Sequence, residues 1–316
     1  MLNTGYTSGG TGLYIVVTFS NLVEDVKQIA CSSDRVDYIA PPNIDPHEYQ
    51  LTPSDISKLR DADIIISTSH THFELEIKEL KDKGVIKADL IEIPSISNIS
   101  IRNNPVTKQP NYHMVIYDPY NYIVFINALR DKLVELNPNC REHYVEASRS
   151  VINMVLKTIS ETPRLNTTAV ADKPFIQYGV EWIGVKIVYF LVKEHDLPVS
   201  QNDLVIIEEY LKNNSVDLVV ISHPKDKYGE WLESTGLKYG KPVLYVPSPL
   251  VNEAIPSKLL NISMQIRSIY NATTSRSLSK PSVQDDKVSK TLLNTLALSL
   301  MIGVIVALVL ILKRRM

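Results

Sequence analysis

The chain is poor in the residues on which several classes of protein depend. Its 316 residues include two cysteines, 11 glycines and only 7% aromatic side chains. Two cysteines are too few for a disulfide scaffold or for a cysteine zinc site, and their spacing leaves open whether Cys31 and Cys140 form a bridge. The 33 basic and 35 acidic residues give a net charge of −2. This balance gives no reason to expect a nucleic-acid partner.

The sequence motifs of common enzymes are also missing. The chain has no HExxH motif of zinc proteases, no GxSxG elbow of hydrolases and no phosphate-binding glycine loop. Its one glycine cluster, SGGTG, lies near the N-terminus at Ser8–Gly12. These absences argue against an enzyme, including a zinc hydrolase.

One long apolar run stands at the C-terminal end. Leu292–Leu312 contains no charged residue and is long enough to cross a hydrocarbon core of about 30 Å as a helix. Three basic residues, 313–315, follow at once, and the positive-inside rule places them in the cytoplasm. We therefore expect a transmembrane helix at 291–312 and a cytoplasmic tail at 313–316. The protein would be a single-pass protein of the cell membrane with an extracellular body.

Glycosylation signals agree with an extracellular body. Five N-x-[ST] triplets occur, which would make the chain a glycoprotein of the cell surface. They begin at Asn98, Asn166, Asn213, Asn261 and Asn271. The alternative is a tail-anchored protein whose body lies in the cytoplasm.

Short apolar runs alternate with helical patterns between residues 13 and 270, which is typical of α/β folds with parallel sheets. The predicted strands are Leu13–Thr18, Val36–Ile39, Asp63–Ser67 and Leu90–Ile93, followed by Thr167–Ala171, Val185–Phe190, Val216–Ile221 and Val243–Val246. The predicted helices include Asn21–Ile29, Pro53–Arg60, Phe73–Lys83, Asn202–Lys212 and Lys225–Ser234.

A longer helical pattern separates the two halves. Arg141–Glu161 has no glycine or proline and carries one apolar stripe, which predicts a continuous helix of about six turns. The fold class expected is α/β, with two lobes bridged by one long rigid helix, plus the transmembrane helix. The predicted parts are a tail (1–12), a first lobe (13–140), a linking helix (141–162), a second lobe (163–271) and a flexible stalk (272–290). Two facing α/β lobes would place a ligand in the cleft between them, at the carboxyl ends of the strands.

Three of the seven histidines lie in loops that could face this cleft. His47 follows the predicted strand 36–39 in a loop stiffened by prolines, His113 follows a polar stretch, and His223 ends the apolar run VDLVVIS. Neutral imidazoles that converge from separate loops suit Zn²⁺ or a similar first-row metal.

The other histidines point less clearly to a site. His70 and His72, in STSHTHFE, lie at a predicted junction between a strand and a helix. Helix capping explains polar residues there, and no third ligand is near in sequence, so a role in metal capture is the alternative. We expect His143 and His195 to be solvated.

Beyond these patterns, the segment PPNIDPHEYQLTPSDISKLRDADIII (Pro41–Ile66) resembles the metal-binding solute-binding proteins of ABC importers. This is the cluster A-I family, which includes zinc and manganese receptors. Ile15–Ile29 and Tyr117–Pro138 are also similar to it, whereas Leu51 stands where the family has proline. The resemblance implies two α/β lobes joined by one rigid helix, a metal ion between them and an ABC permease as partner.

The resemblance also implies a ligand set, with departures. His47 and His113 match the two first-lobe histidines of the family. The third position is Lys173, next to Asp172, and the late aspartate is replaced by Ser248. Neither lysine nor serine is a good zinc ligand. The candidate metal ligands are therefore His47, His113, His223 and Asp172.

We therefore expect a membrane-anchored, non-enzymatic receptor, monomeric, that captures a divalent transition metal for an ABC importer. Three histidines and a carboxylate suit Zn²⁺ best, with Mn²⁺ or another divalent metal as the alternative. A second function stays open: a structural or adhesive surface protein that kept the scaffold and lost metal transport. The replacements at Lys173 and Ser248 and the glycosylation signals favour that alternative.

Overall fold

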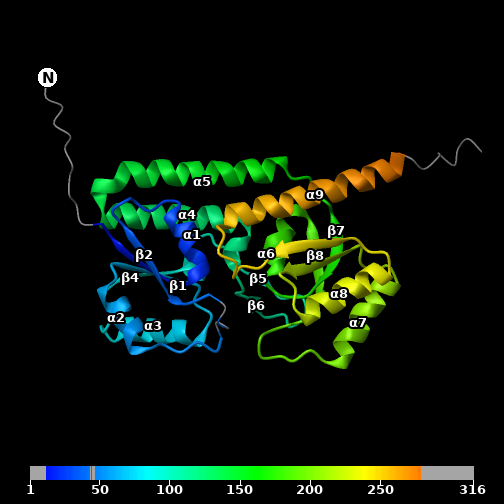
Figure 1. Cartoon of the computed structure of the whole chain (residues 1–316), viewed down its shortest axis with the longest axis horizontal. Helices are drawn as coiled ribbons and strands as arrows, with labels where there is room; N and C mark the ends of the chain where they lie inside the picture. Colours follow the sequence, from blue (N-terminus) through cyan, green and yellow to red (C-terminus); the bar gives the residue numbers. More distant parts are fainter. Residues whose placement is uncertain (1–11, 43, 45–46, 279–316) are drawn as a thin grey trace, which may run out of the picture. The chain divides into compact units, whose positions relative to one another are not determined.

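The computed structural model describes residues 12–42, 44 and 47–278 of the chain (Figure 1). The chain divides into two compact units, Met1–Ile269 and Tyr270–Met316. Both sheets of the α/β fold, and the cavity between them, lie within the first unit. The following description concerns that unit.

The first sheet has four parallel strands in the order β2-β1-β3-β4. Alternate residues of β1 enter different cores: Ile15 and Val17 pack on one face of the sheet, and Val16 packs on the other. Strands buried on both faces are mostly apolar, as β1 and β3 are apart from Thr18 and Ser67. The elements of this lobe are β1 (Tyr14–Phe19), α1 (Val23–Lys27), β2 (Arg35–Ala40), α2 (Pro53–Asp61), β3 (Ile64–Ser67), α3 (His72–Asp82) and β4 (Asp89–Glu92).

The second sheet repeats this plan with four parallel strands in the order β10-β9-β7-β8. A short antiparallel pair, β5 (Arg102–Asn103) and β6 (Pro110–Asn111), precedes it in the sequence. The elements of this lobe are β7 (Thr167–Ala171), α6 (Ile176–Val180), β8 (Val185–Phe190), α7 (Gln201–Lys212), β9 (Leu218–His223), α8 (Lys227–Lys238) and β10 (Val243–Pro247).

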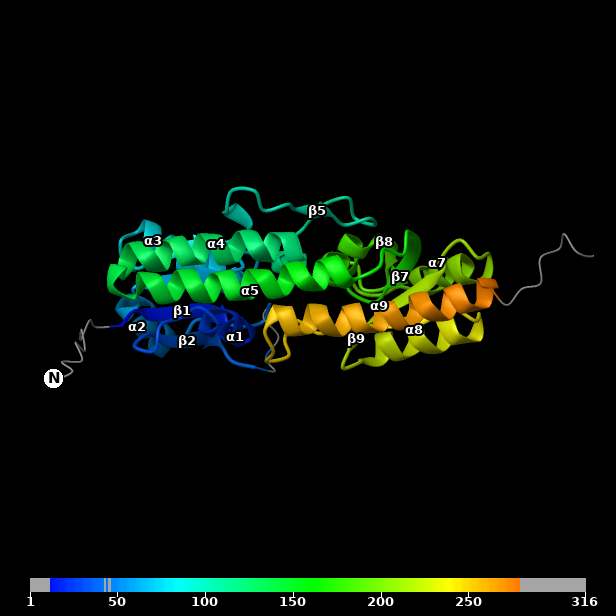
Figure 2. The same ribbon diagram turned by 90° about the horizontal axis from the view of Figure 1, so that it is seen from above.

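Three long helices connect the two sheets: α4 (Pro119–Leu136), α5 (Arg141–Glu161) and the first part of α9 (Ile255–Leu278). In Figures 1 and 2, α5 lies along α4 and then approaches α9 near the second sheet. The hydroxyl groups of Thr162 and Ser263 lie 2.6 Å apart where α5 ends beside α9. The helix predicted over 141–161 is confirmed with both of its ends.

One apolar core joins the two lobes. It begins at β1 and β3, continues through buried side chains of α4 and α5, and reaches β7, β9 and α9 without interruption. Phe125 of α4 and Val155 of α5 are fully buried within it. Because well-packed interiors resist deformation, this shared core holds the two sheets in one arrangement.

The open question about the cysteines is settled by the structure, in which Cys31 and Cys140 are bonded. The bridge ties the segment after α1 to the residue before α5. Next to it, the Asp34 carboxylate accepts hydrogen bonds from the Cys31 N–H at 2.8 Å and from the Tyr144 hydroxyl at 2.7 Å. The beginning of α5 is thus attached to the first lobe covalently and by hydrogen bonds.

The fold class needs one correction. Within the described ranges, no helix is both long and apolar enough to cross a bilayer. The predicted span at 291–312 and the tail at 313–316 lie outside these ranges. The fold described is therefore α/β without a transmembrane helix. In addition, α9 continues to Leu278, so residues 272–278, expected in a flexible stalk, are helical.

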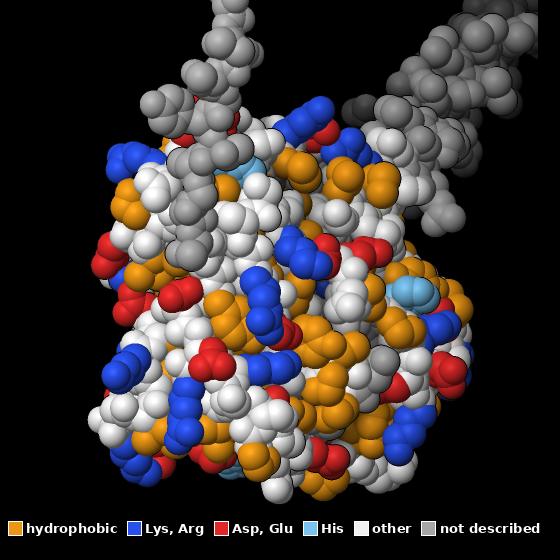
Figure 3. All heavy atoms as spheres, turned by 60° about the vertical axis from the view of Figure 1, so that its left-hand side comes forward, with side chains coloured by type: hydrophobic (Ala, Val, Ile, Leu, Met, Phe, Trp, Pro, Cys, Tyr) orange, Lys and Arg blue, Asp and Glu red, His pale blue; other side chains and the backbone are white. Residues whose placement is uncertain are grey.

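Charge is distributed evenly where the surface can be seen. On the face that Figure 3 shows, the described Lys and Arg side chains are interspersed with Asp and Glu and form no single basic patch. On this face, the pattern agrees with the near-zero net charge.

We expect the double variant Cys31→Ser/Cys140→Ser to be less stable than the wild type. The bridge closes a loop with a sequence separation of 109 residues, and loss of such a cross-link costs about 4 kcal/mol through the entropy of the unfolded chain. Urea unfolding of both proteins measures the difference. Equal midpoints, or a wild type indifferent to reductant, would contradict the prediction.

Candidate metal centre

A cavity of about 390 Å³ lies between the lobes, where the carboxyl ends of both sheets face each other. This is the edge at which open α/β sheets bind ligands. Its walls include apolar residues, such as Phe19 and Phe175, and a smaller number of polar groups. The polar groups include His47, Thr68, His70 and His113 from the first lobe and Lys173, Glu194, His195 and Ser248 from the second.

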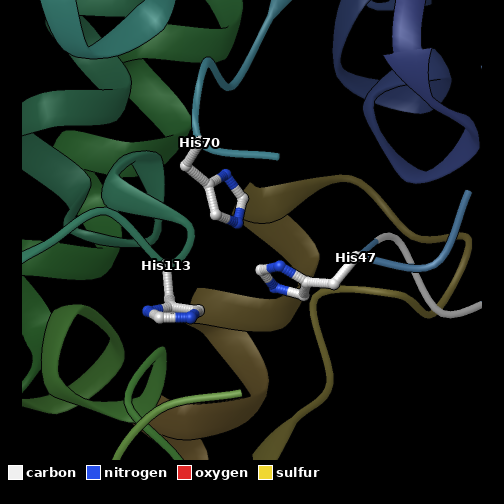
Figure 4. Close-up of side chains that lie close together, drawn as sticks. All are labelled: His47, His70 and His113. Carbon is white, nitrogen blue, oxygen red and sulfur yellow. The ribbon is translucent and has the colours of Figure 1, made fainter. Parts of the chain in front are cut away.

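Three first-lobe histidines converge at this cavity. Each of His47, His70 and His113 offers a ligand atom within 4.8 Å of those of the other two. Figure 4 shows the three rings directed toward a common space. His47 follows β2, His70 follows β3, and His113 lies between β6 and α4. Three imidazoles at this spacing are a suitable set of donors for a transition-metal ion.

His70 is oriented by the residues at its own end of β3. Its Nδ1 lies 2.9 Å from the Thr68 hydroxyl. That hydroxyl donates its proton to the Glu74 carboxylate, so it can only accept a hydrogen bond from His70. The proton of His70 is therefore on Nδ1, and Nε2 is available as a metal ligand.

The Glu74 carboxylate holds the loop between β3 and α3 through hydrogen bonds. Glu74 is 2% exposed and accepts hydrogen bonds from side-chain hydroxyls of β1, β3 and the turn before α3, and from three backbone N–H groups. Burial would raise the pKa of Glu74, but the neighbouring His70 and hydrogen bonds from Thr18 and Thr68 lower it overall. The carboxylate therefore stays ionised and saturated with donors.

His113 is oriented in a similar way by a buried amide. Asn111 donates from Nδ2 to the Pro174 carbonyl and to the Gln177 side chain, both at 2.9 Å. Its Oδ1 lies 3.0 Å from Nδ1 of His113, so Nδ1 donates and Nε2 faces the cavity. Through its contacts with the second lobe, Asn111 therefore fixes the orientation of the His113 ring in the cavity wall.

Burial keeps the imidazoles of His70 and His113 neutral. It lowers the pKa of His70, and the negative charge of Glu74 only partly opposes this. Burial also lowers the pKa of His113 to about 3, assisted by the neighbouring His70, His47 and His195. Neutral imidazole is the form that binds metal, so His70 and His113 are ready to bind at physiological pH.

The second lobe contributes a loop after β8 that meets two of these rings. Oε2 of Glu194 lies 3.7 Å from Nε2 of His113. The ring of His195 stacks on that of His47 with centroids 4.3 Å apart and an angle of 13° between the planes. The two lobes therefore meet at the cluster through adjacent residues of one loop.

The structure brings together two of the four residues predicted as ligands, His47 and His113. His223 is exposed, and its ring contacts Tyr245 rather than the cavity. Asp172 is fully buried behind the cavity, where its carboxylate accepts hydrogen bonds from the N–H and hydroxyl of Ser222. Both lie at the carboxyl ends of second-lobe strands, as expected, but their side chains turn away from the cluster.

The sequence offered metal capture by His70 only as the alternative, and it pointed to neither Glu194 nor His195 as part of a site. His70 was interpreted as part of a helix cap, whereas the capping residues are Thr71 and Glu74. The position of His70 shortly after β3, at the same edge of the sheet as the loop that carries His47, was the signal that could have identified it. Within the loop after β8, the sequence carries no such signal.

Comparisons with known proteins identify the family of the chain. The model of the family described as zinc-uptake complex component A, periplasmic (ZnuA) matches residues 15–246. The chain belongs to this family. The resemblance to metal-binding solute-binding proteins of ABC importers is therefore confirmed, and the family provides no reason to expect an enzyme.

Individual relatives span different shares of the chain. The iron-binding protein YfeA of Yersinia pestis is 26% identical over 273 residues, which cover 80% of this chain and 84% of YfeA. The manganese-binding lipoprotein MntA of Halalkalibacterium halodurans is 31% identical over 144 residues, so the match spans 45% of this chain and only 46% of MntA.

Solved structures show the same fold. The solute-binding protein FpvC of Pseudomonas aeruginosa, in complex with Mn²⁺, superimposes with a TM-score of 0.68 at 16% identity, over 83% of this chain and 99% of FpvC. A crystal structure of ZnuA gives 0.64 at 18% identity, over 82% of this chain and 98% of that one.

The predicted localisation is corrected by these findings. The family is described as periplasmic, one relative is named as a lipoprotein, and no helix in the described part of the chain could span a membrane. A single-pass cell-surface protein with a C-terminal anchor is thus contradicted.

Replacing Glu74 by Gln should destabilise the protein by about 3–5 kcal/mol. The amide N–H₂ of glutamine would face N–H groups that donate hydrogen bonds to the carboxylate in the wild type, and it cannot accept them. Chemical denaturation gives the free energy of unfolding. The exposed Glu76 on the same helix provides the matched control, and Glu76→Gln should change stability by less than about 0.5 kcal/mol. Similar effects of the two substitutions would refute the role of Glu74.

Replacing Asp172 by Asn should alter how stability depends on pH. Burial raises the pKa of Asp172 from 3.8 to about 6, although hydrogen bonds from Ser222 oppose this. Between pH 3.8 and about 6, the folded state therefore binds a proton at Asp172 that the unfolded state has released. The stability that this proton contributes is lost as pH rises through about 6. Relative to the wild type, Asp172→Asn should gain about 2–3 kcal/mol between pH 4 and pH 7.5. Urea titrations at both pH values test this, and parallel pH profiles would exclude it.

Proposed function

We propose that this protein captures a divalent transition-metal ion in the cavity between its lobes and presents it to an ABC permease. The observation that carries the proposal is the convergence of His47, His70 and His113, whose ligand atoms lie within 4.8 Å of one another. Family membership supports the same function, because the family's model is described as a component of zinc uptake.

The ligand set proposed here differs from the one that the sequence suggested. His70 takes the place of His223 and Asp172, which do not line the cavity. The hydrogen bonds of Thr68 and Asn111 present Nε2 of His70 and of His113 to the ion. Rings that are already oriented lose little entropy when they bind, which favours high affinity.

Zinc is the ion that we propose first. Three neutral nitrogen donors suit the tetrahedral preference of Zn²⁺. Manganese prefers oxygen ligands and binds nitrogen sites more weakly. The names of the relatives include manganese and iron as well as zinc, so Mn²⁺ and Fe²⁺ are the alternatives to compare.

The second function considered above, a surface protein that lost metal transport, rests on the replacements at Lys173 and Ser248. These replacements leave the cluster of His47, His70 and His113 intact. An ammonium group near a dication would weaken binding, but Lys173 forms an ion pair with Asp226 at 2.9 Å. We therefore prefer metal capture.

The test is calorimetric titration of the purified, chelator-stripped protein with Zn²⁺, Mn²⁺ and Fe²⁺. We expect one ion per chain, and we expect His70→Ala to weaken Zn²⁺ binding by about a hundred-fold or more, because it removes a direct ligand.

The neighbouring His72 offers a matched control, because it is exposed and does not line the cavity. His72→Ala and His223→Ala should bind as the wild type does. If His223→Ala abolished binding while His70→Ala did not, the ligand set proposed here would be wrong; a wild type that binds no metal would exclude the function.

A further inference from the structure

Three first-lobe histidines leave a four-coordinate ion with one position to fill. The family resemblance implies donors from the second lobe at the positions of Lys173 and Ser248. Here Lys173 has a cationic head that is paired with Asp226, and the Ser248 hydroxyl is a weak ligand. A replacement donor must therefore come from elsewhere in the second lobe.

The residues that line the cavity limit which second-lobe side chains could supply this donor. Among the described second-lobe side chains in its wall, only Glu194 and His195 carry a carboxylate or an imidazole. The others are aliphatic or aromatic, apart from Lys173 and Ser248. Both candidates belong to the loop that follows β8.

The geometry favours Glu194. Its Oε2 lies 3.7 Å from Nε2 of His113, the nitrogen that the Asn111 hydrogen bond leaves available as a ligand. In a tetrahedral zinc site each donor atom lies about 2.0–2.2 Å from the metal. The distance between two such donor atoms is therefore comparable to, or slightly shorter than, the distance between Oε2 of Glu194 and Nε2 of His113. A small movement of the loop would bring Oε2 into the coordination sphere.

Glu194 is held in this position by a buried amide. Asn104 is fully buried, and its Nδ2 donates to Oε1 of Glu194 at 2.9 Å and to the Lys193 carbonyl at 2.8 Å. Its Oδ1 accepts from the N–H groups of Val106 and Thr107, so the amide cannot turn over. One carboxylate oxygen is therefore anchored, and the other is directed to His113.

His195 is less suited to share the ion with His47. Their rings are nearly parallel, with an angle of 13° and centroids 4.3 Å apart. The nitrogen lone pairs lie in the ring planes, so two stacked rings direct them along parallel planes and not to one point. Stacking on His47 makes His195 a packing partner of the ligand.

We infer that Glu194 is the second-lobe ligand of the metal ion, in place of the donors lost at Lys173 and Ser248. This inference rests on the proposed function, because it names the residue that completes the same site. With Glu194 the ion has three neutral nitrogens and one carboxylate, whose negative charge offsets one of the two positive charges of the ion. It also makes binding depend on both lobes, so the ion itself holds the loop after β8 against the first lobe.

The experiment compares the full chain with its Glu194→Gln and His195→Phe variants. Gln can still accept the hydrogen bond from Asn104, and Phe preserves the stacking on His47. Calorimetry gives the dissociation constant for Zn²⁺, and the visible absorption of bound Co²⁺ reports directly on the ligands around the ion. Glu194→Ala provides a second variant if Glu194→Gln does not fold, as judged by thermal melting.

We expect Glu194→Gln to weaken Zn²⁺ binding by about a hundred-fold, at or above the upper end of the 10–100-fold cost of losing an outer-shell partner, and to change the Co²⁺ spectrum. His195→Phe should leave the spectrum unchanged and the affinity within a few-fold. If Glu194→Gln matched the wild type in both measurements, the inference would be overturned while metal capture stood. Loss confined to His195→Phe would also overturn it. A wild type that binds neither ion would overturn the proposed function as well.

Discussion

The candidate site depends on one buried carboxylate. Glu74 collects hydrogen bonds from Thr18 on β1, from Ser67 on β3 and from the turn that leads into α3. A charge this deeply buried is stable only when donors surround it. The same donors fix the backbone on which His70 stands and, through Thr68, the proton on its ring. The stability of the first lobe and the direction of a ligand are therefore two results of one network.

A second buried carboxylate connects the elements that meet between the lobes. Asp25 of α1 accepts from the Tyr122 hydroxyl of α4 at 2.7 Å and from the Ile255 N–H at the start of α9 at 2.8 Å. Nearby, Lys258 donates to the carbonyls of Pro249 and Val251 and so supports the loop that forms one wall of the cavity. Together with the shared apolar core, these contacts make the cleft a rigid feature of the fold.

The two lobes contribute to the cavity in different ways. The first lobe supplies three imidazoles whose hydrogen-bond partners are buried and satisfied. The second lobe has lysine and serine where the sequence resemblance implies ligands, and it pairs the lysine with Asp226. The chain thus shares the family's fold, and its proposed set of metal donors departs from the one that the resemblance implies. An acidic residue in the loop after β8 would compensate electrostatically at the proposed site, because a carboxylate offsets one of the two positive charges of a dication.

Much of the fold could be read from local patterns. The periodicity of 141–161 identified α5 with both ends, and the apolar runs at 167–171 and 185–190 identified β7 and β8. The predicted helix Pro53–Arg60 corresponds to α2, which begins with a capping box formed by Thr52 and Asp55. Such patterns suffice because burial on one or both faces of an element repeats along the chain. The motif around His47 also identified the family and one member of the site.

The membership of the site was decided by tertiary structure. His70 follows β3, and His223 ends β9. Their positions in the sequence do not show which ring enters the cavity, yet the hydrogen bonds of the folded chain turn His70 into it and leave His223 exposed. Asp172 lies next to a cavity residue in the chain, but Ser222 draws its carboxylate into the interior. Glu194 reaches His113 only because Asn104, 90 residues away, holds it. Local sequence determines which elements form, whereas side-chain direction depends on partners that only the folded chain brings within hydrogen-bonding distance.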